Sequence, residues 1–159
     1  MNRRFMLSLL LFLFLGTTRL AQSQTSPELD RVSEAIRQSV SEEMPSVRCR
    51  RGEPMRGSGN VLVEACFAGS NVLKLSVIPY ASKELAKTHF RRFVALGSDM
   101  ESTADVGEES YTWGFRKSDL TFRKDRFNVY IGIDDASAPN AVNIMKDFGK
   151  AVAKALKDL

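Results

Sequence analysis

Two cysteines and one histidine are the side chains of this sequence with the most versatile chemistry. Cys49 and Cys66 are the only cysteines among 159 residues, and His89 is the only histidine. A tetrahedral metal site needs four ligands, and the sequence offers neither a C-x-x-C pair nor a second histidine to complete one. Because thiols that meet an oxidising compartment tend to be bridged, the sequence predicts a structural disulfide between Cys49 and Cys66 and no metal site.

The spacing of the two cysteines fits a β-hairpin. If residues 47–51 and 61–67 pair antiparallel, Cys49 lies opposite Cys66 when the turn is centred between Gly57 and Ser58. The loop from Gly52 to Asn60 contains the glycine, proline and asparagine that such a turn requires. A bridge that closes a loop of this size stabilises the fold by about 3 kcal/mol.

Catalytic motifs are absent from the sequence. His89 is flanked by Lys87, Thr88 and two arginines, with no acid in the same helical turn to orient it, and reads as a partly exposed structural histidine. G-x-S-x-G, phosphate-loop, H-E-x-x-H and calcium-loop patterns do not occur. We therefore expect no catalytic residue and no cofactor. One enzymatic alternative stays open, a histidine-independent hydrolase that uses the acids expected at strand ends, Glu108, Glu109, Asp134 and Asp135.

Arginines and aromatic residues are the candidates for binding. The densest basic cluster is Arg48, Arg50, Arg51 and Arg56, which allows a second alternative, binding of an anionic polymer or a membrane surface. Such charges also commonly keep hairpin ends and sheet edges soluble. Trp113, beside Gly114, marks the place where we expect a pocket. The candidate contacts for a ligand or partner are Trp113, Tyr130, Arg50, Arg51 and Arg56.

The first 23 residues have the pattern of a secretory signal peptide. Arg3 and Arg4 precede an apolar run over residues 5–15, and Ala21 and Ser23 provide the small side chains that signal peptidase requires. The run is too short for a membrane span, which needs about 20 apolar residues. The sequence predicts cleavage after Ser23 or nearby, no transmembrane anchor in the mature form, and a periplasmic or extracellular location.

Removal of this peptide changes the charge of the protein. The chain has a formal net charge of +4, and residues 1–23 contain three arginines and no acid. The remainder, residues 24–159, has 20 basic and 19 acidic residues and a net charge of +1. This balance argues against nucleic acid as a partner.

Periodicity predicts an α+β fold for residues 24–159, taken as one domain. Helical spacing of apolar residues begins at Ser26, at Ser82 and after Pro139, and alternating strands are expected near residues 47–51, 61–67, 72–78, 111–115, 120–122 and 127–133. The acidic stretch 98–109 reads as an irregular loop. This order, α-βββ-α-βββ-α, predicts an antiparallel sheet of five to six strands packed with two to three amphipathic helices, on one face or both.

Part of the sheet face is expected to stay open. The small or polar positions Thr112, Gly114, Asn128 and Gly132 indicate where. On the expected strand 111–115, Tyr111, Trp113 and Phe115 alternate with Thr112 and Gly114 and are expected to share the other face.

One segment resembles a known group of proteins. Residues 106–111, Val-Gly-Glu-Glu-Ser-Tyr, followed by residues 120–129, Leu-Thr-Phe-Arg-Lys-Asp-Arg-Phe-Asn-Val, are similar to the "G-D-E-A-Y" and "F-R-x-G/D-x-x-V-x-V" patterns of small exported bacterial α/β domains. Extracytoplasmic sensor domains of bacterial kinases and PsbP-like or Mog1-like sandwiches are looser relatives of that pattern. The resemblance implies an antiparallel sheet with flanking helices and binding of a ligand or partner, and it carries over no catalytic residue. Together with the absence of catalytic motifs, it leads us to expect an exported, non-catalytic binding domain.

Overall fold

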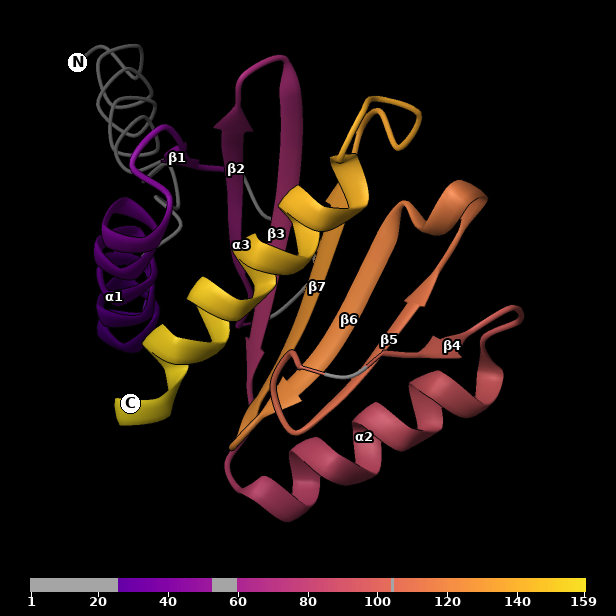
Figure 1. Cartoon of the computed structure of the whole chain (residues 1–159). Coiled ribbons are helices and arrows are strands. Elements are labelled where there is room, and N and C mark those ends of the chain that lie inside the picture. Colours follow the sequence, from indigo (N-terminus) through magenta and orange to yellow (C-terminus); the bar gives the residue numbers. More distant parts are fainter. Residues whose placement is uncertain (1–25, 53–59, 104) are drawn as a thin grey trace, which may run out of the picture.

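The chain folds into three α-helices and one antiparallel sheet of seven strands over the part described by the computed structural model, residues 26–52, 60–103 and 105–159 (Figure 1). In chain order the elements are α1 (Pro27–Glu43), β1 (Arg48–Arg51), β2 (Leu62–Ala68), β3 (Asn71–Pro79), α2 (Lys83–Leu96), β4 (Glu101–Ser102), β5 (Glu109–Trp113), β6 (Asp119–Lys124), β7 (Phe127–Ile133) and α3 (Ala141–Ala155), with short 3₁₀ turns at Phe115–Lys117 and Leu156–Asp158.

The α+β class and the helix and strand order predicted from the sequence are confirmed, except for one additional strand. β4 lies in the stretch expected to be an irregular loop, and it pairs Glu101 with Thr112 and Ser102 with Tyr111 of β5. Both β4 residues are exposed. A strand of two exposed residues forms through backbone hydrogen bonds alone, so it leaves no hydrophobic alternation in the sequence.

Helices α1 and α2 begin where serine can cap them. The Ser26 hydroxyl accepts a hydrogen bond from the Leu29 amide at 3.3 Å, and Pro27 occupies the first helical position, where a missing N–H costs nothing. The Ser82 hydroxyl caps α2 in the same way, with the Leu85 amide at 3.1 Å. These caps fix the helix starts at the positions expected from the sequence.

Two meanders meet at the centre of the sheet. The strand order is β1-β2-β3-β7-β6-β5-β4, and every neighbouring pair is antiparallel. β3 and β7, the last strand of each meander, pair side by side, with Leu75 opposite Ile131. The first half of the chain therefore builds one side of the sheet and the second half builds the other.

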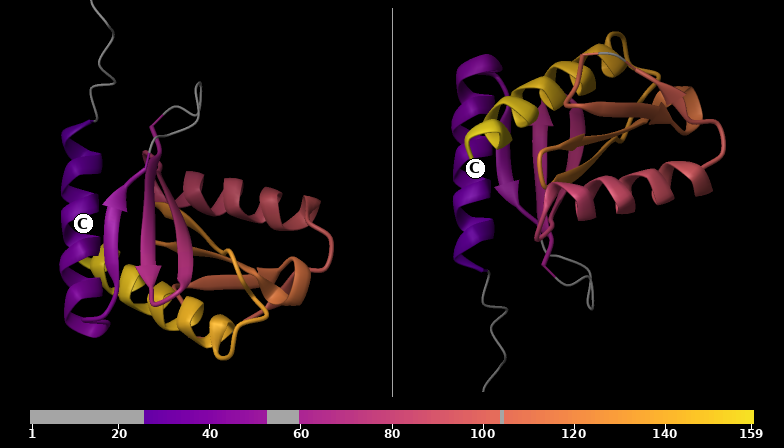
Figure 2. Two further views of the ribbon diagram at one scale, coloured as in Figure 1. Left: turned by 90° about the horizontal axis from the view of Figure 1, so that it is seen from above. Right: turned by 90° about the horizontal axis from the view of Figure 1, so that it is seen from below.

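Helices lie on both faces of the sheet. α1 and α3 pack against one another on one face, and α2 lies on the opposite face (Figure 2). The core between the sheet and the α1–α3 pair consists of fully buried side chains, among them Leu62, Leu75, Phe122, Ile131 and Phe148. α3 approaches the sheet closely, because a Cβ atom added at Gly149 would lie 2.8 Å from Leu120 Cδ2.

The α2 face is only partly covered. The sheet contacts of α2 fall mainly on β6 and β7, and the interior of β6 is buried on both of its faces. β2 and β3 instead alternate between buried residues and residues that are partly or fully exposed. Among the described helices, none therefore covers the side of β1–β3 that faces away from α1 and α3.

The open face is not where the sequence placed it. Asn128 is fully buried beneath α2, and its side-chain amide donates to the Ala86 carbonyl at 3.2 Å. Thr112 is 3% exposed and points to the other face, since it lies opposite Leu120. Small or polar residues on a strand indicate an open face only when no helix covers them, and the strand's own sequence does not contain that information.

Candidate functional site

The candidate site is the uncovered side of β1, β2 and β3, which we call the open half. The strand register assigns its residues, because side chains directly opposite one another in adjacent strands share a face. Arg50 lies opposite Ala65, and Ala65 opposite Lys74. By the same register the open half comprises Arg48, Arg50, Val63, Ala65, Phe67, Val72, Lys74, Ser76 and Ile78.

Apolar side chains form the centre of the open half. Val63, Ala65, Phe67 and Val72 are all partly exposed, whereas the inward positions beside them, such as Leu73, are fully buried. A row of partly exposed apolar residues on a flat sheet, without a covering helix, is a surface suited to contact with another apolar surface.

Three cations and no acid stand on the open half. Arg48, Arg50 and Lys74 are exposed, and none of them forms an ion pair with a described residue. The Arg50 guanidinium lies over the Phe67 ring, 5.0 Å from its centre. Arg48 donates to the Val47 carbonyl at 3.0 Å. The open half is therefore an apolar strip bordered by positive charge.

Strand alternation divides the arginine cluster of the sequence between the two faces. Arg51 lies opposite Glu64, on the α1 side, and donates to Asp30 of α1 at 2.9 Å. Arg48 and Arg50 face the open half. Arg56 lies outside the described residues. The structure thus places Arg50 and Lys74 on the same face of the sheet, a proximity that the sequence did not indicate. Arg51 lies on the other face.

The predicted aromatic candidates pack beneath α2. Phe93 of α2 makes edge-to-face contacts with Trp113, at 5.6 Å between ring centres, and with Tyr130, at 4.9 Å. Burial raises the pKa of Tyr130 to about 12. Phe115 does not share the face expected for it. Gly114 adopts a left-handed turn with φ of 80°, and Phe115 follows it into the 3₁₀ turn with 78% of its surface exposed.

His89 and the strand-end acids have structural partners. His89 is exposed on α2 and its ring lies 5.0 Å from that of Tyr80. Glu108 and Glu109 both form ion pairs with Arg123, whose side chain is only 8% exposed. Asp134 accepts a hydrogen bond from the Val72 amide at 2.7 Å, and Asp135 accepts from the Ser137 amide and hydroxyl. These bonds lower the pKa of Asp135.

The predicted disulfide between Cys49 and Cys66 is confirmed. The two cysteines are register partners in β1 and β2, with Cα atoms 4.0 Å apart and a sulfur–sulfur distance of 2.06 Å. Cys66 is fully buried and Cys49 partly so. The bridge lies on the α1 side of the hairpin, opposite to the open half.

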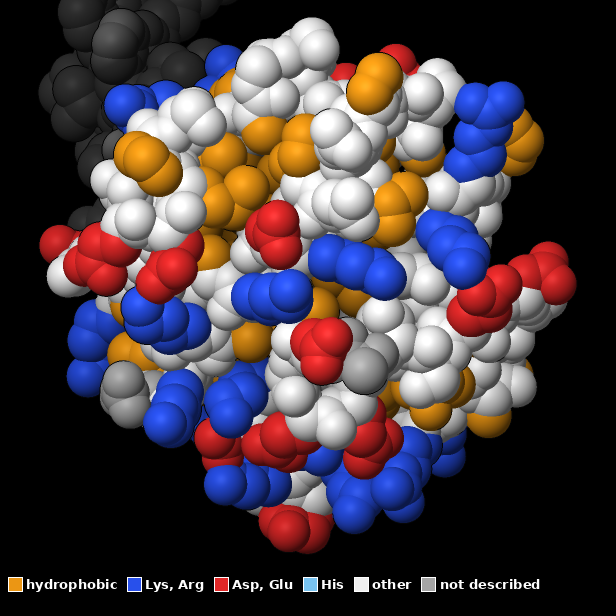
Figure 3. All heavy atoms as spheres, in the orientation of Figure 1, with side chains coloured by type: hydrophobic (Ala, Val, Ile, Leu, Met, Phe, Trp, Pro, Cys, Tyr) orange, Lys and Arg blue, Asp and Glu red, His pale blue; other side chains and the backbone are white. Residues whose placement is uncertain are grey.

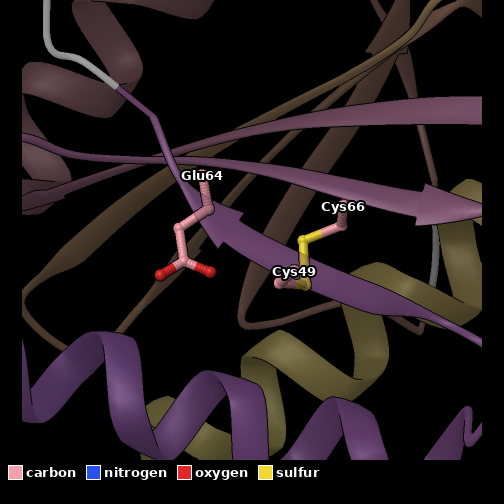
Figure 4. A group of neighbouring side chains, drawn as sticks. All are labelled: Cys49, Glu64 and Cys66. Carbon is pink, nitrogen blue, oxygen red and sulfur yellow. A yellow bond between two sulfur atoms is a disulfide. The ribbon is translucent and has the colours of Figure 1, made fainter.

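Glu64 is a buried acid that sequence reasoning missed. Its carboxylate lies on the same side of β2 as the disulfide, within 4.8 Å of both sulfur atoms (Figure 4). Ser33 donates to it, as does Arg37 of α1, whose Nε lies at 3.2 Å. Its position between Leu62 and Cys66 in the alternation of β2 is the signal that could have identified it.

The cluster of Cys49, Glu64 and Cys66 does not act as a metal centre in this form. Both sulfurs are joined in the disulfide, so neither is available as a thiolate ligand. The Glu64 carboxylate already has a hydroxyl and a guanidinium as partners. The arrangement is that of a structural link between the hairpin and α1.

The α1–α3 side of the molecule has a cleft with mixed charge. A cavity of about 520 Å³ lies between the end of α1 and α3 and is lined by Glu43, Met44, Pro45, Ser46, Asp147, Lys150, Ala151 and Lys154. Glu43 and Lys154 form an ion pair across it. Acidic and basic side chains are interleaved over this face, so it presents no field of a single sign (Figure 3).

Comparisons with known proteins place this chain in no established group. No family model, curated protein or solved structure matches it. The predicted signal peptide, residues 1–23, lies outside the described residues. Over residues 26–52, 60–103 and 105–159, no helix is both long enough and apolar enough to cross a bilayer.

Proposed function

We propose that this chain is an exported, non-catalytic domain that binds a ligand or a protein partner through the open half of its sheet. One observation carries the proposal: α2 covers the β6–β7 side of its face and leaves an apolar strip on β1–β3, bordered by cations that form no ion pair within the described part of the chain. Helices cover both faces of β6 and β7, whereas this strip stays accessible. An accessible apolar strip of this kind is best explained as the binding surface for a partner.

Export to the periplasm or the medium rests on independent features. The basic start, apolar run and small residues before Gln24 favour cleavage by signal peptidase, and a disulfide requires an oxidising compartment to persist. The resemblance of residues 106–129 to small exported domains agrees with this location. Mass spectrometry of the protein from the exported fraction should give a mature chain that begins at or near Gln24.

The strand-end acids do not favour the hydrolase alternative. Each of them has a hydrogen-bonding or ion-pair partner that accounts for its position. A broad hydrolase panel tests the point. Turnover that disappears in an acid-to-amide variant of Glu108, Glu109, Asp134 or Asp135 would contradict a non-catalytic function.

Site-specific photocrosslinking in the native host tests the binding proposal directly. A photoreactive phenylalanine analogue at Ser76, on β3 of the open half, should yield a discrete adduct with a partner. The same analogue at Lys87, which is exposed on α2, is the matched control and should yield none. Absence of an adduct at Ser76, or equal adducts at both positions, would overturn the proposal.

A further inference from the structure

We infer that the occupant of the open half is an amphipathic α-helix of another protein, with an apolar stripe bordered by acidic residues. The inference rests on the proposed function, because it names the partner of the same surface. Three observations support the inference: the dimensions of the strip, its charge, and the short edge strands of the sheet.

The dimensions of the strip match one helix. Over the four residues of β1, three strands spaced by about 4.8 Å make the strip about 10 Å wide, which is the diameter of an α-helix with its side chains. β3 has nine residues, Asn71–Pro79, and so spans about 30 Å. A helix of about 20 residues has the same length. On the same face of the sheet, α2 already covers the neighbouring strands β6 and β7, and the strip is the part that it leaves uncovered.

The positive charge of the open half indicates which side chains the partner helix carries. Arg50 and Lys74 lie two strands apart on either side of Ala65, and neither forms an ion pair with a described acid. Acidic residues that flank an apolar stripe would pair with both cations while the stripe covers Ala65 and Phe67. Such pairs gain strength because docking removes water from around them.

Charge also argues against two other occupants of the open half, a second copy of this chain and the predicted signal peptide. A second copy of this chain would place Arg48, Arg50 and Lys74 against identical cations. The predicted signal peptide, with Arg3, Arg4 and Arg19, carries the same sign. Addition of an extended strand at a sheet edge is disfavoured because the edge strands β1 and β4 have only four and two residues.

A membrane surface fits the strip less well than a helix does. Its apolar side chains are only partly exposed, and they lie in the plane of the sheet and not on a protruding loop. Three cations alone give weak attraction to anionic lipid, about 1 kcal/mol each.

Designed peptides test the inference on the disulfide-bonded chain from Gln24. The probe is a fluorescein-labelled helical 20-mer with leucines along one face and glutamates on both borders. The first comparison peptide has the same composition in an order without an apolar face, and the second has lysine in place of each glutamate. Fluorescence anisotropy at 50 and 300 mM salt measures binding, and anionic phosphatidylglycerol vesicles are titrated in parallel.

We expect the acidic amphipathic peptide to bind and the two comparison peptides to bind at least tenfold more weakly. Arg50→Glu and Lys74→Glu should each weaken binding about tenfold, and Ala65→Gln, which places an amide in the apolar centre, should also weaken it severalfold. Lys87→Glu makes the same charge change on α2 and should leave binding within twofold. Thermal unfolding establishes that each variant is folded.

Several results would overturn the inference. Equal binding of the reordered peptide would mean that charge alone attracts it, and binding of vesicles without binding of the acidic peptide would identify a lipid surface. A crosslink at Ser76 in the host, together with failure of the acidic peptide, would refute the helix while the proposed binding function stands.

Discussion

The single buried acid of the hairpin, Glu64, lies beside the disulfide. Glu64 lies within 4.8 Å of both sulfurs, and Arg37, which partners it, is 42% exposed at its side chain. Reduction by a thiol releases one cysteine as a thiolate, and a neighbouring carboxylate disfavours that negative charge. We therefore expect Glu64 to slow reduction of the bridge, in addition to linking β2 to α1 through Ser33 and Arg37.

Replacement of Glu64 by glutamine should make the disulfide easier to reduce. Glu64→Gln keeps the shape of the side chain and removes the charge, so we expect reduction by dithiothreitol to accelerate about tenfold, equivalent to about 1.4 kcal/mol. Alkylation followed by mass spectrometry measures the rate. Glu34→Gln, an exposed acid-to-amide change on α1, is the control and should leave the rate unchanged. An unchanged rate in Glu64→Gln would show that the carboxylate does not shield the bridge.

The phenol of Tyr130 should lose its proton only at high pH. Its folded pKa of about 12 exceeds the ordinary value of 10.0, so the folded state holds the phenol proton more tightly than the unfolded state. This contribution to stability is complete below pH 10 and is lost as the pH rises through 12. The absorbance at 295 nm of the wild type minus that of Tyr130→Phe should give a midpoint near 12. A midpoint near 10 would mean that Tyr130 is hydrated.

At the scale of the elements, the local sequence pattern predicted whether each segment is a helix or a strand. It did not predict which other elements cover that segment. Serine caps and apolar periodicity placed the helices correctly, and the hairpin spacing predicted the cysteine register. The open half was missed because Val63, Ala65 and Phe67 look like buried strand residues until the position of α2 is known. Long-range packing decides their exposure, and nothing in the sequence of β2 encodes it.

The close approach of α3 to the sheet gives a test of that packing. A methyl group at position 149 would lie 2.8 Å from Leu120 and 3.1 Å from Val106. The resulting crowding should exceed the helix propensity gained, about 1 kcal/mol, so Gly149→Ala should lower the free energy of unfolding by about 1 kcal/mol. Urea unfolding measures it.

A matched substitution separates crowding from propensity. Asn143 is exposed on α3, and Asn143→Ala should raise stability slightly, by about 0.5 kcal/mol, because alanine is the better helix former. If Gly149→Ala were stabilised by a similar amount or more, the close contact between α3 and β6 would be wrong.

At the scale of the whole molecule, the two faces of the sheet are built differently. One face is closed by α1 and α3, the first and last of the described α-helices, which pack on each other. The other is closed in part by α2, and its uncovered remainder is the surface that we assign to a partner. The class, the helix number and the disulfide could be predicted from the sequence, whereas this asymmetry is a property of the assembled sheet.

Removal of α3 should abolish the fold. A chain that ends at Asn140 lacks Met145, Phe148 and Val152, which are all fully buried, and exposes the core face of β6 and β7. Burial of each of these side chains contributes about 2 kcal/mol, and the sum is comparable to the stability of a small domain. Circular dichroism and urea titration should show no cooperative transition. A cooperative transition in the shortened chain would contradict the assignment of α3 to the core.

The pairing of α1 with α3 also sets the order of events during synthesis. α1 precedes every described strand and α3 follows them, so the apolar stripe of α1 stays partly uncovered on a growing chain until α3 has been synthesised. A polypeptide that crosses a membrane through a narrow channel has to remain unfolded during the passage. If the chain is exported as proposed, a face that closes only with α3 would help it to remain unfolded until α3 is free to pack.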